Sequence, residues 1–384
     1  MNKIVLITPI LQHYRLSFYE KLSRSFNESQ FAVFHGIKKI EDGRPGYIGA
    51  TEFVNKGFEE FKIRIYPFDI VYNWGMFSEL KKLNPDIIII QGITGNLSYR
   101  RIVFWAKKKR KKIIIWTSGW EPGKSKGILL NFKNMLVKSF FKKADSFLTY
   151  SEFGTEYVMS KGIEKSIIET CYNGIENDDL IKNSSEIIRK SKEIRIEYNL
   201  EGYITFLFVG GLIPEKKVEL LISAFIELRK KHDKIKLIII GDGPLKLMVK
   251  ETLKDNNDLN IIYLGRIVDG VDPYFAASDC FVLPGVGGLA LNQAMFWGKT
   301  CIVSKADGTE DDLVIDGITG YRFKENNLAS LVSAMDRRIN EKKDKVDTMS
   351  DSSRQIIHNK SNVNNMVNVF SKAINRLLIK NEKF

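Results

Sequence analysis

Cysteine and proline are scarce in this chain of 384 residues, which has three cysteines and nine prolines. The cysteines Cys171, Cys280 and Cys301 are far apart and stand in apolar surroundings. This excludes a disulfide framework and a cysteine-based metal site, and it predicts buried thiols. The few prolines, together with 44% hydrophobic and 11% aromatic residues, exclude a wholly disordered chain.

Long apolar runs are also missing. The longest, such as residues 87–90 and 237–240, have the length of strands and fall well short of the ~18 residues that a membrane-spanning helix needs. The first nine residues lack the apolar region and cleavage site of a signal peptide and predict an opening strand. We therefore expect a cytoplasmic protein, and its length favours two domains.

Acidic residues are scarce in one segment, residues 101–144, where 13 lysines and arginines accompany a single acid, Glu121. From residue 128 onward, apolar residues recur at helical spacing among the lysines, which predicts a basic amphipathic helix. Such a helix suits an anionic membrane surface; equally, its apolar stripe suits packing on its own domain with the lysines in solvent. No recognition motif accompanies the charge, so we expect no nucleic-acid partner.

Strand-like apolar runs alternate with amphipathic helical patterns along most of the chain, which predicts the α/β class with parallel sheets covered by helices. We expect a first domain over residues 1–175, a linker region over residues 176–203 and a second domain over residues 204–360. Residues 361–384 are expected to form a helix that packs back toward the first domain. Open α/β sheets bind ligands at the carboxyl ends of their strands, so a cleft between the two sheets is the expected site.

A strand, a glycine turn and a helix start open the second domain. Gly210 and Gly211 follow the strand, and Lys216 stands just before the helix. Backbone amides, a helix amino end and a lysine together suit a diphosphate. An ordinary strand-to-helix turn with surface lysines has the same features, so this motif alone leaves both interpretations open.

A second segment of the same kind is more distinctive. Gly285, Gly287 and Gly288 precede a helix that begins near Leu289, and Gln293 lies one turn into that helix. Three glycines in four residues expose a row of backbone N–H groups, which fits a phosphorylated sugar. A tight turn that needs positive φ would also use such glycines. The spacing relative to the lysine of the first segment favours a binding site.

These segments, in their order, resemble the GT-B fold glycosyltransferases of family 4, which transfer a sugar from a nucleotide-sugar with retention of configuration. The resemblance is best over residues 204–323 and continues more weakly over residues 112–175. Besides the two glycine segments, it rests on residues 239–244, 263–265, 277–279 and 316–320. It implies two doubly wound, Rossmann-like domains.

The resemblance also implies roles for single residues. Lys216 takes the place of the family's diphosphate-binding lysine, and Arg266 and Ile267 border the nucleobase. Three charged groups of the family's donor site are replaced: an arginine by Gly211, and two glutamates by Gly285 and by Gln293, which keeps the ability to hydrogen-bond a ribose. The chain is therefore expected to be a divergent branch that binds its donor with backbone amides.

The first domain offers further candidates. His13 and Arg15, in the loop after the first strand, are placed to meet the acceptor or the donor phosphates, or to act only in local packing. Ser118 lies near the position that a histidine has in the family, so this chain also differs from the family pattern there. Glu121 is a candidate general base beside Trp120, which suits an acceptor platform. His13, Ser118 and Glu121 are thus the candidate catalytic residues.

We therefore expect a retaining glycosyltransferase that extends a lipid-linked glycan in surface polysaccharide biosynthesis. It would be peripheral on the inner face of the cell membrane through residues 101–144. Two alternatives remain open: a non-catalytic nucleotide-sugar-binding partner in a glycan assembly complex, and a sugar-nucleotide epimerase or hydrolase. No Asp-X-Asp pair stands at a strand end of the expected site, so no metal or other cofactor is expected.

Overall fold

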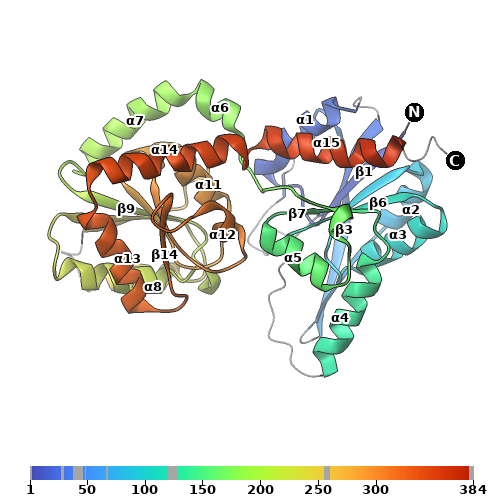
Figure 1. Ribbon diagram of the computed structural model, residues 1–384, viewed down its shortest axis with the longest axis horizontal. Coiled ribbons are helices and arrows are strands. Elements are labelled where there is room, and N and C mark those ends of the chain that lie inside the picture. Colours follow the sequence, from blue (N-terminus) through green and yellow to red (C-terminus); the bar gives the residue numbers. More distant parts are fainter. Residues whose placement is uncertain are drawn as a thin grey trace. The chain divides into compact units, whose positions relative to one another are not determined.

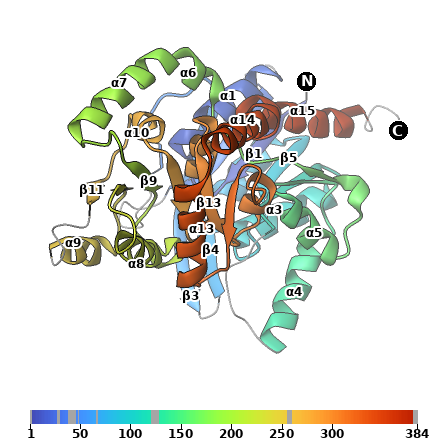
Figure 2. The ribbon, with the colours of Figure 1, turned by 60° about the vertical axis from the view of Figure 1, so that its left-hand side comes forward.

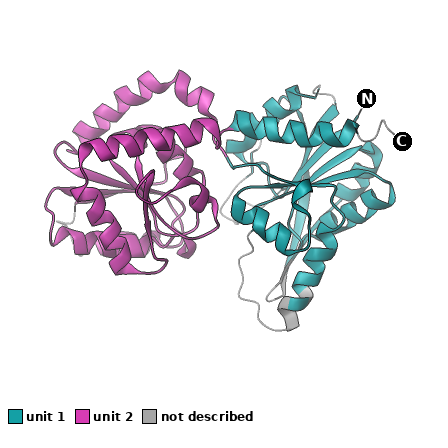
Figure 3. Cartoon of the chain, in the orientation of Figure 1, with its two compact units in different colours: residues 1–173, 363–384 teal, residues 174–362 magenta. Residues whose placement is uncertain are grey.

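The computed structural model describes residues 2–26, 30–37, 46–47, 49–65, 68–119, 128–254 and 260–379. The chain divides into two compact units, the first made of residues 1–173 and 363–384 and the second of residues 174–362 (Figure 3). Each unit has its own sheet. The predicted α/β class is confirmed.

Unit 1 contains an eight-stranded sheet in the order β4-β3-β2-β1-β5-β6-β7-β8. All neighbours pair in parallel except β3 and β4. The strands are β1 (Ile4–Thr8), β2 (Phe31–Ile37), β3 (Val54–Ile65), β4 (Phe68–Asn73), β5 (Ile87–Gln91), β6 (Lys112–Thr117), β7 (Ser146–Thr149) and β8 (Ile168–Thr170). The helices are α1 (Leu16–Arg24), α2 (Met76–Leu83), α3 (Leu97–Lys108), α4 (Ile128–Phe141), α5 (Glu152–Ser160) and α15 (Val363–Ile379).

The central strands of unit 1 are apolar at every position because both faces of the sheet are covered. In β1, Val5 and Ile7 face a core that includes residues of α2 to α5, whereas Ile4 and Leu6 face a core that includes residues of α1 and α15. The last helix of the chain thus completes the first unit. Figure 1 shows α15, in red, beside α1, in blue.

Unit 2 contains a six-stranded parallel sheet in the order β11-β10-β9-β12-β13-β14. This is the doubly wound order, which reverses direction between β9 and β12. Its strands are β9 (Ile204–Val209), β10 (Ile235–Ile240), β11 (Ile261–Gly265), β12 (Cys280–Leu283), β13 (Thr300–Ser304) and β14 (Gly320–Phe323). Its helices are α6 (Asn177–Lys182), α7 (Ser184–Glu197), α8 (Val218–Arg229), α9 (Lys246–Lys254), α10 (Asp272–Ala277), α11 (Leu289–Phe296), α12 (Thr309–Leu313), α13 (Leu328–Asn340) and α14 (Lys343–Asn359).

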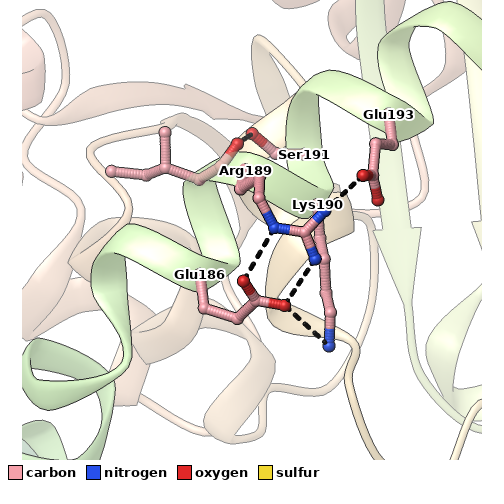
Figure 4. Close-up of polar contacts among 6 residues, drawn as sticks. Glu186, Arg189, Lys190, Ser191 and Glu193 are labelled. Atoms are coloured by element: carbon pink, nitrogen blue, oxygen red, sulfur yellow. Dashed lines mark hydrogen bonds and ion pairs between the residues drawn. The ribbon is translucent and has the colours of Figure 1, made fainter.

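Residues 176–203, which the sequence pattern predicts as a linker region, instead contain α6 and α7 and belong to unit 2. Ile194 and Leu200 are buried in its core, and α7 packs against α10 (Figure 2). The solvent face of α7 is strongly charged, which is why the sequence pattern of this segment predicts a linker. On that face Arg189 pairs with Glu186 at 2.7 Å and with Glu193, as Figure 4 shows.

The three cysteines are free thiols buried in the cores, as predicted, and burial raises the pKa of Cys171 and Cys280 to about 12. In the parts of the chain that the structure describes, no helix combines the length and apolar character needed to cross a membrane.

Candidate functional site

Three loops of unit 2 meet at the carboxyl edge of its sheet, on either side of the point where the strand order reverses. The loop after β9 contains Gly210 and Gly211, and the loop after β10 lies directly on it. Gly241 approaches so closely that a β-carbon there would lie 1.9 Å from the Gly210 carbonyl oxygen. The backbone N–H of Leu212 donates to the Asp242 carbonyl at 2.9 Å. The loops are thus held by backbone contacts that depend on glycine.

Lys216 joins the loop after β9 to the loop after β12. Its Nζ donates to the carbonyl oxygens of Val286, at 2.6 Å, and Gly287, at 2.5 Å. A β-carbon on Gly288 would lie 3.4 Å from the same Nζ. The structure therefore brings together the lysine and the second glycine segment, 70 residues apart in the sequence. This places a cation at the reversal point, where doubly wound sheets bind ligands.

Gly285 has no room for a side chain. A β-carbon there would lie 2.0 Å from the Glu215 carbonyl oxygen, and the neighbouring N–H of Val286 donates to that oxygen at 2.9 Å. Gly211 is the opposite case, because the nearest atom to a β-carbon there would be 4.0 Å away, on Ile213. The glutamate implied at position 285 by the resemblance is thus sterically incompatible with this backbone, whereas an arginine at position 211 would fit.

Gln293, on α11, donates through Nε2 to the Asp272 carboxylate of α10 at 3.5 Å. The same carboxylate accepts from Trp297 Nε1 at 2.9 Å. Burial raises the pKa of Asp272, although these two hydrogen bonds favour its charged form. A carboxylate from another element therefore lies beside the position where the resemblance implies a glutamate. No motif of the sequence indicates Asp272, because its contact with Gln293 joins two separate helices.

Two further acids lie close together, Asp307 in the loop between β13 and α12 and Glu310 in α12. The Asp307 carboxylate would be 3.4 Å from a β-carbon on Gly287. Glu310 is 1% exposed and accepts from the backbone N–H groups of Ala306 and, at 3.3 Å, Gly308. Its Oε2 is buried without a hydrogen-bond partner among the described residues. Burial, and then the charge of Asp307, raise the pKa of Glu310 to about 7.

The residues expected at the nucleobase lie one strand further out. Arg266 follows β11 and is exposed, whereas Ile267 is partly buried against the core of unit 2. The Gly265 carbonyl accepts from the N–H of Gly241 at 2.7 Å, which joins this loop to the others. Leu289 begins α11 and is also partly buried against that core. The predicted donor residues of unit 2 thus lie along one edge of its sheet.

The candidates in unit 1 also lie at a carboxyl edge. His13 is exposed and starts the turn after β1, with its ring centroid 5.9 Å from that of Tyr47. Arg15 is buried against Trp116 of β6. Ser118 follows β6, and its carbonyl packs on α5, where a β-carbon on Gly154 would be only 2.6 Å away.

Glu121 and Trp120 lie outside the described residues, so their predicted roles stay predictions. Within the described ranges, no group of three or more His, Cys, Asp or Glu side chains is arranged to hold a metal ion.

The predicted basic helix corresponds to α4, and part of its apolar stripe serves the core. Val137, Phe140 and Phe141 are each 1% exposed and pack inside unit 1. Met135, by contrast, is 57% exposed. Lys138 and Lys142 are exposed as well. The helix thus both closes its own core and presents an exposed methionine among lysines.

Comparison with known proteins agrees with this geometry. Residues 190–356 match the family model of the group 1 glycosyl transferases. An uncharacterised glycosyltransferase of Methanocaldococcus jannaschii is 28% identical over 280 residues, which cover 68% of this chain and 69% of that protein. A lipopolysaccharide 1,2-N-acetylglucosaminetransferase of Salmonella typhimurium is 25% identical over 184 residues, covering 44% of this chain and 47% of that protein.

An Anabaena protein, solved in complex with UDP, superposes with a TM-score of 0.74 and 13% identity, covering 98% of this chain and 100% of that chain. At this identity the likeness shows the fold. Taken with the sequence matches, it establishes that the chain is a glycosyltransferase of the GT-B fold, with a group 1 glycosyl transferase domain over residues 190–356.

Proposed function

We propose that the chain is a retaining glycosyltransferase of family 4 that transfers a sugar from a nucleotide-diphosphate-sugar to a glycan acceptor. The observation that carries the proposal is the Lys216 ammonium, held by two carbonyls of the glycine loop after β12. A cation between two glycine loops at the reversal point of a doubly wound sheet suits a diphosphate. The UDP complex of the Anabaena structure supports a nucleotide-diphosphate donor.

In this proposal the bond between the sugar C1 and the diphosphate breaks, and the acceptor hydroxyl oxygen bonds to C1 on the same face. The leaving diphosphate carries the developing negative charge, which the lysine and the loop amides stabilise. The departing phosphate accepts the hydroxyl proton, so no side-chain base is required. No metal ion takes part, and a chelator is expected to leave turnover unchanged.

Two acids that lie outside the two glycine segments would replace the missing glutamates. We assign Asp272, through its contact with Gln293, to the hydroxyls of the ribose. We assign Asp307, beside Gly287, to the hydroxyls of the transferred sugar. Each carboxylate oxygen accepts hydrogen bonds from such hydroxyls. Donor binding would thus depend on carboxylates that the family's usual spacing does not indicate.

The direct test is saturation-transfer NMR against uridine, guanosine, thymidine and cytidine diphosphate sugars. We expect one of them to bind and the Lys216→Ala variant to bind it about tenfold more weakly, because a charge-assisted contact is lost. Lys217→Ala is the matched control, since the ammonium of Lys217 pairs with Glu325 at 2.7 Å. Equal weakening in both variants, or donor binding without transfer to any acceptor, would contradict the proposal.

We propose further that the acceptor is lipid-linked, that it belongs to surface polysaccharide biosynthesis, and that α4 holds the enzyme on the inner, anionic face of the cell membrane. The Salmonella lipopolysaccharide transferase supports a glycan acceptor on a lipid. Met135 and Lys138 are exposed on α4, and Lys142 is exposed directly after its end. An exposed apolar residue among lysines suits a membrane surface, where each lysine contributes about 1 kcal/mol against anionic lipid.

Replacing four lysines of α4 and of the two residues directly after it by glutamine is expected to release the protein from anionic vesicles in a sedimentation assay. The variant changes Lys133, Lys138, Lys142 and Lys143. The control changes four exposed lysines of unit 2, Lys324, Lys342, Lys343 and Lys345, and is expected to stay bound. Equal release of both variants would show that only net charge matters, and unchanged binding of the first would remove α4 from the proposal.

A further inference from the structure

Arg15 is a buried cation at the carboxyl end of β1. It is 4% exposed and lies in the turn between β1 and α1. The residue before it, Tyr14, is 51% exposed, so the turn borders the surface. Arginine stays charged at any pH that a folded protein meets, and burying a charge without a partner is costly.

Aromatic rings surround this guanidinium. Its Cζ lies 4.9 Å from the ring centroid of Trp116, 5.6 Å from that of Tyr14 and 5.9 Å from that of Tyr150. Ring faces attract a cation but do not accept its in-plane N–H bonds. Among the described residues its one hydrogen-bond acceptor is Met366 Sδ, at 3.5 Å, a weak acceptor. Within the described part of the chain, five N–H donors therefore meet one weak acceptor.

No carboxylate of the described residues pairs with this guanidinium. The titratable groups that it influences are Tyr19, Tyr150 and Cys171. Burial raises the pKa of Tyr19 and Cys171 to about 12 and also raises the pKa of Tyr150, so all three are neutral at pH 7. Glu169, whose charge acts on Cys171, forms its ion pair with Arg376 at 2.8 Å.

We propose that Arg15 binds a phosphate group of the acceptor, as a phosphate monoester or a diphosphate ester. The planar guanidinium fork matches two phosphate oxygens at once, and phosphate would supply the missing negative charge. The site lies at the carboxyl edge of the unit 1 sheet, where open α/β sheets bind ligands. This inference rests on the proposed transferase function and narrows the acceptor to a phosphorylated one.

Calorimetric titration of the full chain with inorganic diphosphate tests this site separately from the donor site. We expect two sites in the wild type, one in Arg15→Gln and one in Lys216→Ala. Arg101→Gln is the matched control, because that guanidinium also lies over an aromatic ring, Phe77, at 4.3 Å, but on the exposed face of α3. Two sites remaining in Arg15→Gln, or a single wild-type site that only Lys216→Ala abolishes, would overturn the inference.

The two proposals can fail independently. If Lys216→Ala keeps both sites while Arg15→Gln loses one, the donor assignment is wrong and the phosphate site stands.

A second measurement does not depend on the folding of the glutamine variant. Arg15→Lys keeps the positive charge but lacks the guanidinium. The wild-type NMR resonance that is missing from the spectrum of this variant is therefore that of the Arg15 Nε–H. We expect inorganic diphosphate to shift that resonance in the wild type. A resonance that does not move at saturating diphosphate would overturn the proposal even if Arg15→Gln fails to fold.

Two phosphates distinguish a lipid-borne acceptor from a soluble one. Farnesyl diphosphate in phosphatidylcholine vesicles represents the first, and glucose 6-phosphate in solution represents the second. We expect Arg15→Gln to bind one of them about tenfold more weakly than the wild type does, from the loss of a charge-assisted bidentate contact. Equal affinity of wild type and variant for both phosphates would overturn the proposal.

Discussion

Replacing Gly285 by glutamate is expected to lower kcat/KM about 100-fold, the effect of displacing a reactive centre by about 1 Å. The added β-carbon would lie 2.0 Å from the Glu215 carbonyl oxygen, so the loop after β12 has to move away from the loop after β9. Lys216 binds two carbonyls of the moving loop, and its ammonium would move with them. Steady-state kinetics with the donor found by NMR measures the loss.

Gly211 provides the matched control, because it is a glycine of the same edge with open space around it. Gly211→Ala is expected to change kcat/KM by less than about twofold, as surface substitutions usually do. Gly211→Arg adds the positive charge that the resemblance implies there, and we expect it to tighten donor binding. Higher turnover in Gly285→Glu would mean that the site has decayed from an ordinary one, and would contradict a site built around glycine.

Most of the fold could be predicted because the central strands are buried on both faces. Strands such as β5 and β6 are continuous apolar runs between helical patterns, and the apolar run at residues 87–90 lies within β5 (Ile87–Gln91). The hairpin of β3 and β4 could not be predicted in this way. Phe61 and Ile63 are exposed beside Glu59 and Lys62, so no alternation of buried and exposed residues marks the strand.

The candidate site was only partly predictable. The glycine segments and Lys216 belong to strand–turn–helix patterns, which are local and visible in the sequence. The steric limit at Gly285 depends on a carbonyl 70 residues away, at Glu215, and no local pattern contains that contact. Asp272 likewise reaches Gln293 from another helix. For Glu310 there was a signal: it lies in an acidic stretch, residues 307–312, directly after a buried strand.

Glu310→Gln is expected to make the protein more stable than the wild type at pH 8 while leaving stability at pH 5 nearly unchanged. The pKa of Glu310 is about 7 in the folded protein, against an ordinary 4.5, so the folded state holds a proton that the unfolded state releases between these values. The wild type therefore loses stability as pH rises through 7. Glutamine is neutral at both pH values, and the expected gain at pH 8 is about 3 kcal/mol, since each unit of pKa shift corresponds to about 1.4 kcal/mol.

Urea unfolding of the two proteins at pH 5, 6, 7 and 8 would measure this difference. Glu186→Gln is the control, because Arg189 lowers the pKa of that exposed carboxyl to about 2, and any effect of the substitution should be constant over the same range. Parallel curves for wild type and Glu310→Gln would mean that the pKa of Glu310 is the same in the folded and the unfolded state, and would contradict the prediction.

The same titration bears on donor binding. Ionised Glu310 adds negative charge next to Asp307, which lies beside the loop that holds Lys216. A diphosphate bound there would be repelled, so donor affinity of the wild type is expected to fall as pH rises through about 7, while Glu310→Gln keeps its affinity. Donor titrations at pH 6 and pH 8 decide this. A fall that is equal in both proteins would come from another group, and would separate Glu310 from the donor site.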